Sequence, residues 1–245
     1  MVVVVTGGGS GIGLATARLL AELGASVAVL DLNTTAVPAG VLSLTCDITD
    51  DLAVQTAIAA TASAYGRIDA VVNNAAIAGE RGSIEDVDLA VWRQVWEVNV
   101  LGAVRVTRAA LPYLRRSAEP VIVNTCSMVV GFGLPGLAMY AVTKGALQAL
   151  TLATAADLAA DGIRVAAVAP GPTDTGNGNT PTDRIPIRRL LDPREVAHVT
   201  ASLLTATGVT GVVWPVTGGM GTVQAPETAD VSMVVEVPVK SLESR

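Results

Sequence analysis

Short runs of β-branched residues alternate with longer alanine-rich segments along most of this 245-residue chain. Such alternation is typical of βαβ units, in which right-handed crossover helices connect the parallel strands of one sheet. Only the link Asp31–Gly40 is too short and too rich in Pro and Gly for a full helix. We therefore expect an α/β fold. The expected strands are Val2–Val5, Ser26–Leu30, Val41–Leu44, Ala70–Val72, Val121–Thr125, Arg164–Ala169 and Gly211–Trp214. The expected helices are Ile12–Leu23, Asp51–Tyr65, Leu89–Leu114, Ala138–Ala160 and Pro193–Thr205.

The composition fits a core of small branched side chains. Hydrophobic residues make up 51% of the chain and aromatic residues only 3%, as expected for a parallel sheet covered by alanine-rich helices. No apolar run approaches the roughly 18 residues that a membrane span requires. The opening valines have no basic flank and are too few for a signal peptide. We expect a soluble protein of the cytoplasm.

The net charge and the few cysteine and histidine residues argue against nucleic-acid binding, a metal site and a hydrolase triad. The net charge is -6, and the basic residues form no stripe, so we expect no nucleic-acid partner. Cys46 and Cys126 each follow an expected strand and are interpreted as reduced, buried thiols. The single histidine, His198, has no cysteine or second histidine nearby, so we expect no metal site. A hydrolase triad that uses His198 is also disfavoured, because the chain offers no partner serine in a motif of the G-x-S-x-G kind.

A glycine-rich turn, VVVVTGGGSGIG, joins the first strand to the first helix. Gly7 permits a tight turn, and the helix that begins near Gly11 presents free N–H groups and the positive end of its dipole. The pattern therefore favours a pyrophosphate site, although an ordinary tight turn is the alternative. Asp31 directly follows the second strand, at the spacing of a carboxylate that holds an adenine ribose. A turn residue or helix cap is the other interpretation of Asp31.

Asp31 also bears on the choice of cofactor. A carboxylate accepts hydrogen bonds from the ribose 2′- and 3′-hydroxyls and repels a 2′-phosphate. No Arg or Lys in the glycine turn or just after Asp31 offsets that repulsion. We expect NAD(H) to be preferred over NADP(H).

A tyrosine and a lysine stand four residues apart in YAVTK, at Tyr140 and Lys144. On a helix this spacing places both side chains on one face. Lys144 and Lys240 are the only lysines of the chain, and the neighbours of Lys144 are small or apolar. A solvated surface pair is the alternative, but the pattern favours a functional pair.

Six separated motifs occur together: TGGGSGIG, NNAA at Asn73–Ala76, Asn99, Ser127, the Tyr140/Lys144 pair, and PGPT at Pro170–Thr173. In order and spacing, including the thirteen residues from Ser127 to Tyr140, they resemble the short-chain dehydrogenase/reductase family. The resemblance runs from Val2 to about Gly221. It implies a Rossmann-like, doubly wound, seven-stranded parallel sheet with helices on both faces, in a single domain over residues 1–221.

The resemblance implies a catalytic tetrad for interconverting a secondary alcohol and a ketone. Tyr140 would be the general acid/base. Lys144 would bind the nicotinamide ribose and favour the tyrosinate form. Ser127 would hydrogen-bond the substrate oxygen, and Asn99 would hold a water that links Lys144 to solvent. An ammonium about 4 Å from a phenolate supplies about 4 kcal/mol at an effective dielectric constant of 20, so one lysine suffices to stabilise the base.

The family also implies a set of cofactor-binding residues. Asp47 and Ile48 would lie at the adenine, and Thr173 would reach the nicotinamide carboxamide. Simpler interpretations are a helix cap for Asp47, and ordinary turns at Asn73–Asn74 and Pro170–Thr173. Ala76 replaces the usual glycine and requires a negative φ. The full set is Gly7, Ser10, Gly11, Ile12, Gly13, Asp31, Leu32, Asp47, Ile48, Asn74, Ala75, Ala76, Tyr140, Lys144, Pro170, Gly171 and Thr173.

Substrate and assembly are less constrained. The segment MVVGFGLPGLAM between Ser127 and Tyr140 is uncharged and apolar, which favours hydrophobic carbon near the reacting centre. The alternative is core packing. In the family the helices expected at Leu89–Leu114 and Ala138–Ala160 pair between subunits, so we expect a homotetramer or homodimer. A catalytically silent NAD-binding or scaffold protein is the competing function, and an epimerase of the extended type is disfavoured.

A C-terminal extension, residues 222–245, departs from the family pattern. Val235, Val237 and Val239 alternate with Glu236, Pro238 and Lys240. This pattern is typical of an edge strand or extended arm, and a disordered tail is the alternative. One hypothesis is that it forms an arm that packs on a neighbouring subunit, and the pattern does not decide between this arm and a tail.

Overall fold

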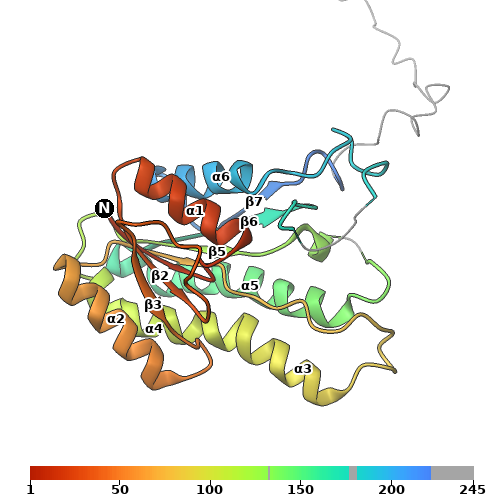
Figure 1. Cartoon of the computed structure of the whole chain (residues 1–245), viewed down its shortest axis with the longest axis horizontal. Helices are drawn as coiled ribbons and strands as arrows, with labels where there is room; N and C mark the ends of the chain where they lie inside the picture. The colour runs from red at the N-terminus through yellow and green to blue at the C-terminus, as the bar shows by residue number, and fades with distance from the viewer. Residues whose placement is uncertain (132, 177–180, 222–245) are drawn as a thin grey trace, which may run out of the picture.

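Seven parallel strands form one sheet between two layers of helices in the computed structural model, which describes residues 1–131, 133–176 and 181–221 (Figure 1). The strand order is β3-β2-β1-β4-β5-β6-β7. The α/β sheet expected from the alternating pattern is confirmed. The strands are β1 Val2–Thr6, β2 Ser26–Asp31, β3 Leu42–Thr45, β4 Ala70–Asn73, β5 Val121–Thr125, β6 Arg164–Pro170 and β7 Val212–Val216.

Helices α1 (Gly11–Glu22) and α6 (Pro193–Thr205) cover one face of the sheet, and α2 (Asp51–Tyr65), α4 (Ala103–Leu114) and α5 (Ala138–Asp157) cover the other (Figure 1). Successive strand side chains point to opposite faces. In β1 this places Val3 and Val5 in the core under α1 and α6, and Val4 in the core under the other helices. The core is built mainly from valine, alanine, leucine and isoleucine, as the composition predicts.

The order of the strands determines where a ligand site can form. From β1 the chain adds β2 and β3 on one side, and β4 to β7 on the other. The connections that leave the carboxyl ends of β1 and β4 therefore run to opposite faces and leave a crevice between them. Ligands of open α/β sheets bind at such a switch point.

The helical run expected over Leu89–Leu114 is confirmed with the same bounds, but it is not one regular α-helix. It consists of α3 (Leu89–Trp96), a π-helical segment (Glu97–Gly102) and α4. The π segment brings the Asn99 side chain onto the backbone of Ile77, and it accommodates Ile48 against Gly102. Hydrophobic periodicity does not distinguish a short π segment from an α-helix. Such segments are frequently found at functional sites.

The other boundaries shift by a few residues. The helix expected over Ala138–Ala160 ends at Asp157 and is followed by a 3-10 turn at Ala159–Asp161. No helix of the described residues has the length and apolar character to cross a membrane. The predicted arm over residues 222–245 lies outside the described residues, as does the proposed domain boundary after residue 221.

Asp69 directly precedes β4 and connects three segments at the amino-terminal edge of the sheet. Its side chain is buried and accepts hydrogen bonds from the backbone N–H of Val2 (2.8 Å), the Ser117 hydroxyl (2.6 Å) and the Arg67 guanidinium (2.8 Å). Burial alone would raise the pKa of Asp69, but the bonds from Ser117, Val2 and Arg67 outweigh it and hold the pKa below its usual range. The ionised carboxylate therefore stabilises the folded state.

We expect Asp69→Ala to lower the free energy of unfolding by about 3 kcal/mol at neutral pH, because it removes the acceptor of three hydrogen bonds and leaves the buried N–H of Val2 unpaired. The pKa of Asp69 is lower in the folded than in the unfolded state. Its contribution is thus complete above the unfolded pKa and is lost as the pH falls through the folded pKa. Urea unfolding at neutral and acidic pH measures both effects.

Asp161→Ala provides a matched control for that experiment. Asp161 pairs with Arg115 at 2.8 Å, but both side chains are more than a third exposed. An exposed pair contributes about 0–1 kcal/mol. Equal losses of stability in the two variants would contradict a structural role for Asp69.

Candidate active site

The glycine turn after β1 is held by close backbone contacts that leave no room for side chains. Gly7 has a φ of +64°, and a Cβ there would lie 2.7 Å from the Cα of Ala75. A Cβ on Gly13 would lie 2.1 Å from the carbonyl oxygen of Gly7. The glycines thus allow helix α1 to begin directly against the turn. Ser10 makes no side-chain cap on α1, so the first N–H groups of the helix remain available to an anion.

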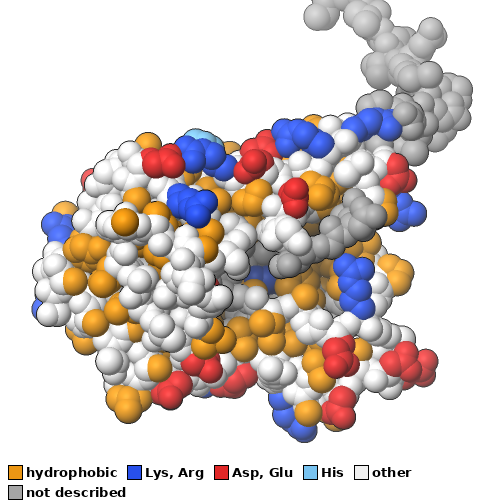
Figure 2. Space-filling view, viewed as in Figure 1, with side chains coloured by type: hydrophobic (Ala, Val, Ile, Leu, Met, Phe, Trp, Pro, Cys, Tyr) orange, Lys and Arg blue, Asp and Glu red, His pale blue; other side chains and the backbone are white. Residues whose placement is uncertain are grey.

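A hollow of about 770 Å³ opens over the carboxyl ends of β1, β2 and β4, next to the glycine turn. Figure 2 shows that this face of the molecule is hollowed near its middle. Most predicted cofactor-binding residues line the hollow: Gly7, Ser10, Gly11, Ile12, Asp31, Leu32, Asp47, Ile48, Asn74, Ala75, Ala76 and Tyr140. Gly13, Lys144, Pro170, Gly171 and Thr173 do not line it.

Asp31, the last residue of β2, lies at the rim of the hollow. Its Oδ2 accepts a hydrogen bond from the N–H of Gly9 at 2.8 Å, and its Oδ1 accepts one from the N–H of Asn33 at 2.9 Å. Each carboxylate oxygen can accept a further bond. The carboxylate is therefore oriented and still able to bind ligand hydroxyls. Leu32, which is largely exposed, continues the rim.

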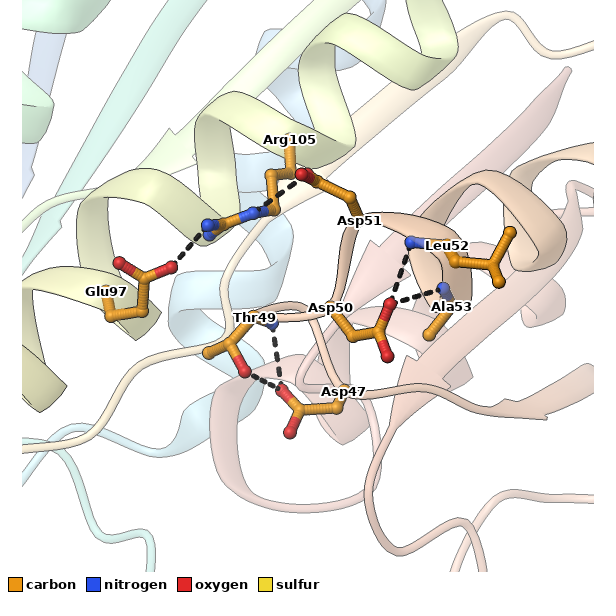
Figure 3. Close-up of polar contacts among 8 residues, drawn as sticks. All are labelled: Asp47, Thr49, Asp50, Asp51, Leu52, Ala53, Glu97 and Arg105. Carbon is orange, nitrogen blue, oxygen red and sulfur yellow. Dashed lines mark hydrogen bonds and ion pairs between the residues drawn. The ribbon is translucent and has the colours of Figure 1, made fainter.

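The loop after β3 brings Asp47 and Ile48 to the lining of the hollow. Figure 3 shows Asp47 with its partner Thr49 and the neighbouring start of α2. Asp47 Oδ1 accepts hydrogen bonds from the N–H and the hydroxyl of Thr49, each at 2.8 Å. Asp50, rather than Asp47, caps α2 by accepting from the N–H groups of Leu52 and Ala53. The helix-cap interpretation of Asp47 is therefore wrong.

The NNAA segment joins the centre of the sheet to the glycine turn. Asn73 is the last residue of β4, not a turn residue, and its Nδ2 donates to Asn124 Oδ1 (2.9 Å) and Thr107 Oγ1 (3.1 Å). Asn74 Nδ2 donates to the carbonyl oxygens of Thr6 and Gly7. Ala76 is not among the described non-glycine residues with positive φ, so its methyl group causes no strain.

Tyr140 and Lys144 lie one turn apart on α5, and Lys144 is buried, with 2% of its surface exposed. Its Nζ donates to the carbonyl oxygen of Thr125 at 2.7 Å and lies 5.6 Å from the centre of the Tyr140 ring. The surface-pair alternative is therefore wrong. Burying an ammonium is costly unless an anion lies close by, and the oxygen from Thr125 is neutral. The arrangement therefore favours negative charge on a group beside Lys144.

Ser127 follows β5 by two residues, close to the carbonyl that holds Lys144. Its Oγ accepts a hydrogen bond from the N–H of Val129 at 3.3 Å, within the 3-10 turn Met128–Gly131. Because Lys144 bonds to the end of β5, α5 is fixed against the strand that leads to Ser127. The neighbouring Cys126 is buried, and burial raises the pKa of its thiol to about 11 despite the charge of Lys144. This thiol and that of Cys46, whose pKa burial also raises to about 11, stay protonated.

Asn99 is buried in the π-helical segment and joins it to two neighbours. Its Oδ1 accepts from the N–H of Ile77 (2.8 Å), and its Nδ2 donates to the Ile77 carbonyl (2.9 Å) and to Thr143 Oγ1 (3.0 Å). Thr143 directly precedes Lys144. The side chain of Asn99 thus positions these segments.

The loop after β6 reaches the hollow through Thr175, a residue outside the motifs that indicated the site. Thr173 Oγ1 instead donates to the carbonyl of Gly171 at 2.9 Å. Thr175 lines the hollow, and its methyl group lies 3.2 Å from the position of a Cβ on Gly11. The available signal was a second threonine two residues further along. The other lining residues missed are Leu30, Cys46, Thr49, Ile77, Ala78, Gln94, Glu97 and Val98.

A dinucleotide fits this geometry. The volume is within the roughly 300–1,000 Å³ of small-molecule and cofactor sites. One end offers the N-terminus of α1 for phosphates, and the rim offers Asp31 for hydroxyls. Among residues 1–131, 133–176 and 181–221, no three His, Cys, Asp or Glu side chains gather as for a metal ion.

Comparisons with known proteins agree with this geometry. A family model described as enoyl-(acyl carrier protein) reductase matches residues 7–221. Cis-4-hydroxycyclohexanecarboxylate dehydrogenase of Sinomonas cyclohexanicum is 36% identical over 237 residues, covering 89% of this chain and 95% of that protein. L-fucose dehydrogenase of Bos taurus is 36% identical over 239 residues, covering 89% and 88%. The crystal structure of 3-ketoacyl-(acyl-carrier-protein) reductase from Brucella melitensis complexed with NADH has a TM-score of 0.86 at 32% identity, covering 90% and 98%.

Proposed function

The chain belongs to the short-chain dehydrogenase/reductase family, and from that premise we propose that it interconverts a secondary alcohol and a ketone with NAD(H). It is an oxidoreductase that acts on CH–OH donors, as its curated relatives are. The observation that carries the finer proposal is the buried Lys144, 5.6 Å from the ring of Tyr140 and bonded to the end of the strand that leads to Ser127.

Three residues of the tetrad act on the substrate or the cofactor in this proposal, and the fourth, Asn99, positions the turn of α5 before Lys144. In the oxidation direction the Tyr140 phenolate accepts the hydroxyl proton of the alcohol, and in reduction the phenol returns it. The Lys144 ammonium favours the phenolate by its charge and donates to the nicotinamide ribose. The Ser127 hydroxyl donates to the substrate oxygen. The bound nicotinamide supplies the hydride acceptor or donor.

The cofactor assignments extend along the hollow. The N-terminus of α1 binds the pyrophosphate, Asp31 accepts from the adenine ribose hydroxyls, and Asp47 and Ile48 bind the adenine. Pro170, Gly171 and the threonines that follow lie toward the nicotinamide. The relatives support a nicotinamide cofactor, and the carboxylate of Asp31 supports NAD(H) over NADP(H).

For the substrate we propose a secondary alcohol on a compact ring or short carbon chain, with apolar carbon beside the reacting centre. Met128–Gly131, the turn after Ser127, carries apolar side chains, of which Val129 is buried and Val130 exposed. Curated relatives act on hydroxycyclohexanecarboxylate, a dichlorocyclohexadienediol and meso-2,3-butanediol by their names. These share an alcohol on a small carbon skeleton.

The direct test is NADH formation from NAD⁺ with a panel of aliphatic, cyclic, aromatic and steroid secondary alcohols. NADP⁺ is tested in parallel. We expect turnover with NAD⁺, fastest with small cyclic alcohols. Tight NADH binding without turnover of any alcohol or ketone would instead favour a catalytically silent binding protein.

We also propose a homotetramer with partner-facing helices α3 to α5. Trp96, Val142 and Leu152, on α3 and α5, are apolar and 40–51% exposed, as expected of side chains that a second subunit covers. Sedimentation of the full chain measures this assembly. A location in the cytoplasm, with neither membrane nor nucleic acid as a partner, stays a prediction.

A further inference from the structure

We propose that Arg105 is a positioning residue that holds the adenine loop, residues 47–50, against the π-helical segment Glu97–Gly102. The inference rests on the proposed function, because it concerns how the adenine end of the cofactor site is held in place. Figure 3 shows the Arg105 side chain between Asp51, which follows the adenine loop, and Glu97. None of these three residues belongs to the motifs that indicated the family.

Arg105 bridges two elements that are distant in the sequence. Its side chain is 19% exposed and comes from the first turn of α4. Its Nε pairs with Asp51 Oδ1 at 2.9 Å, and its Nη2 pairs with Glu97 Oε1. Asp51 is the first residue of α2, and Glu97 is the first residue of the π-helical segment. A planar guanidinium can hold two carboxylates at once in fixed directions, which an ammonium does less well.

Hydrogen bonds within the adenine loop fix its conformation, so an ion pair at the end of the loop determines where the whole loop lies. Within the loop, Asp47 accepts two hydrogen bonds from Thr49. Asp50 caps α2 through two further bonds, so the loop and the start of the helix are tied together. Asp51 is therefore an anchor for the whole loop. A second contact, Ile48 against Gly102, presses the loop on the same segment but has no fixed direction.

Both elements that Arg105 joins line the cofactor hollow. Asp47 and Ile48 belong to the adenine loop, and Glu97 and Val98 belong to the π-helical segment. Without the cation, the carboxylates of Asp51 and Glu97 repel each other, which pushes the loop away from that segment. One guanidinium nitrogen, Nη1, is buried without a hydrogen-bond partner in the described part of the chain. Burying Nη1 without a partner lowers the stability of the folded state, so the two ion pairs of Arg105 must contribute more than this loss.

The test measures the affinities of NADH and of ADP-ribose, which lacks the nicotinamide, by calorimetry. We expect Arg105→Gln to weaken both by the same factor, about tenfold. The KM for the cofactor should rise by that factor, while kcat at saturating cofactor changes less, because Tyr140 and Lys144 come from α5. Arg108→Gln is the matched control. Arg108 lies one turn further along α4 and lines the same 320 Å³ hollow between α2 and α4 as Arg105.

A second variant, Asp51→Asn, tests the same interaction in case Arg105→Gln does not fold. Asp51→Asn removes one anchor at a side chain that is 75% exposed, so the fold should tolerate it. We expect it to weaken both ligands, and we expect the double variant to bind no more weakly than Arg105→Gln alone. Fully additive losses would overturn the proposal.

The remaining outcomes separate this inference from the proposed function. If the wild-type protein binds neither NADH nor NADPH, the proposed function fails and the inference fails with it. If the wild type binds NADH and Arg105→Gln binds it equally well, only the inference fails. It also fails if Arg105→Gln weakens NADH but leaves ADP-ribose unchanged, because the effect would then lie at the nicotinamide end.

Discussion

Tyr140→Phe should reduce kcat for alcohol oxidation by about 10³-fold or more, with NADH affinity changed by less than about threefold. The substitution removes the phenolic oxygen that accepts and returns the substrate proton in the proposed mechanism, and it keeps the ring that lines the cofactor hollow. A 10³-fold loss corresponds to about 4 kcal/mol of transition-state stabilisation. Steady-state kinetics with the best alcohol of the panel, combined with NADH titration, measures both quantities.

The chain offers a matched control because it has only three tyrosines. Tyr113 lies on α4, where Arg116 stacks over its ring at 5.0 Å, away from the residues that line the cofactor hollow. Tyr113→Phe should retain wild-type kcat. If Tyr140→Phe retained more than about a tenth of wild-type kcat, another group would have to be the general acid/base.

The fold could be predicted from the sequence because the relevant signals are local. The five inner strands of this sheet, β2, β1, β4, β5 and β6, are buried on both faces along most or all of their length, so each is a short apolar run whatever its neighbours are. The valines of β1 and the glycines that follow show this plainly, since both the strand and the turn are determined by adjacent residues. The π-helical segment was missed because its cause is not local. It depends on Asn99 bonding to Ile77 and on Ile48 packing against Gly102.

The site was predictable where a role requires a particular residue at a particular spacing. Tyr140 and Lys144 are one helical turn apart, and Asp31 ends a strand beside the glycine turn, so their neighbours follow from the topology. Choices between similar residues were not predictable. Asp47 and Asp50 both precede α2, and only the structure shows that Asp50 is the cap. No sequence pattern indicated Arg105, because its partners, Asp51 and Glu97, belong to other elements.

Asp31→Ala should shift the ratio of kcat/KM for NAD⁺ to that for NADP⁺ by about 10³-fold toward NADP⁺. The variant loses hydrogen bonds between the ribose hydroxyls and a charged acceptor, worth about 1.5–3 kcal/mol. It also removes the repulsion between the carboxylate and a 2′-phosphate, which is of similar or larger size at a separation of about 5 Å. Asp31→Asn, which removes the charge but keeps an acceptor, should give an intermediate ratio.

The ratio is the informative quantity because Asp31 also has a structural task. It accepts from the N–H groups of Gly9 and Asn33, so its removal loosens the turn and weakens both cofactors together, which cancels in the ratio. Asp47→Ala is the matched control, because it removes a carboxylate from the same hollow, at the end that we propose binds the adenine. It should weaken both cofactors equally and leave the ratio unchanged. A wild-type preference for NADP⁺, or an equal shift of the ratio in both variants, would show that Asp31 does not select the cofactor.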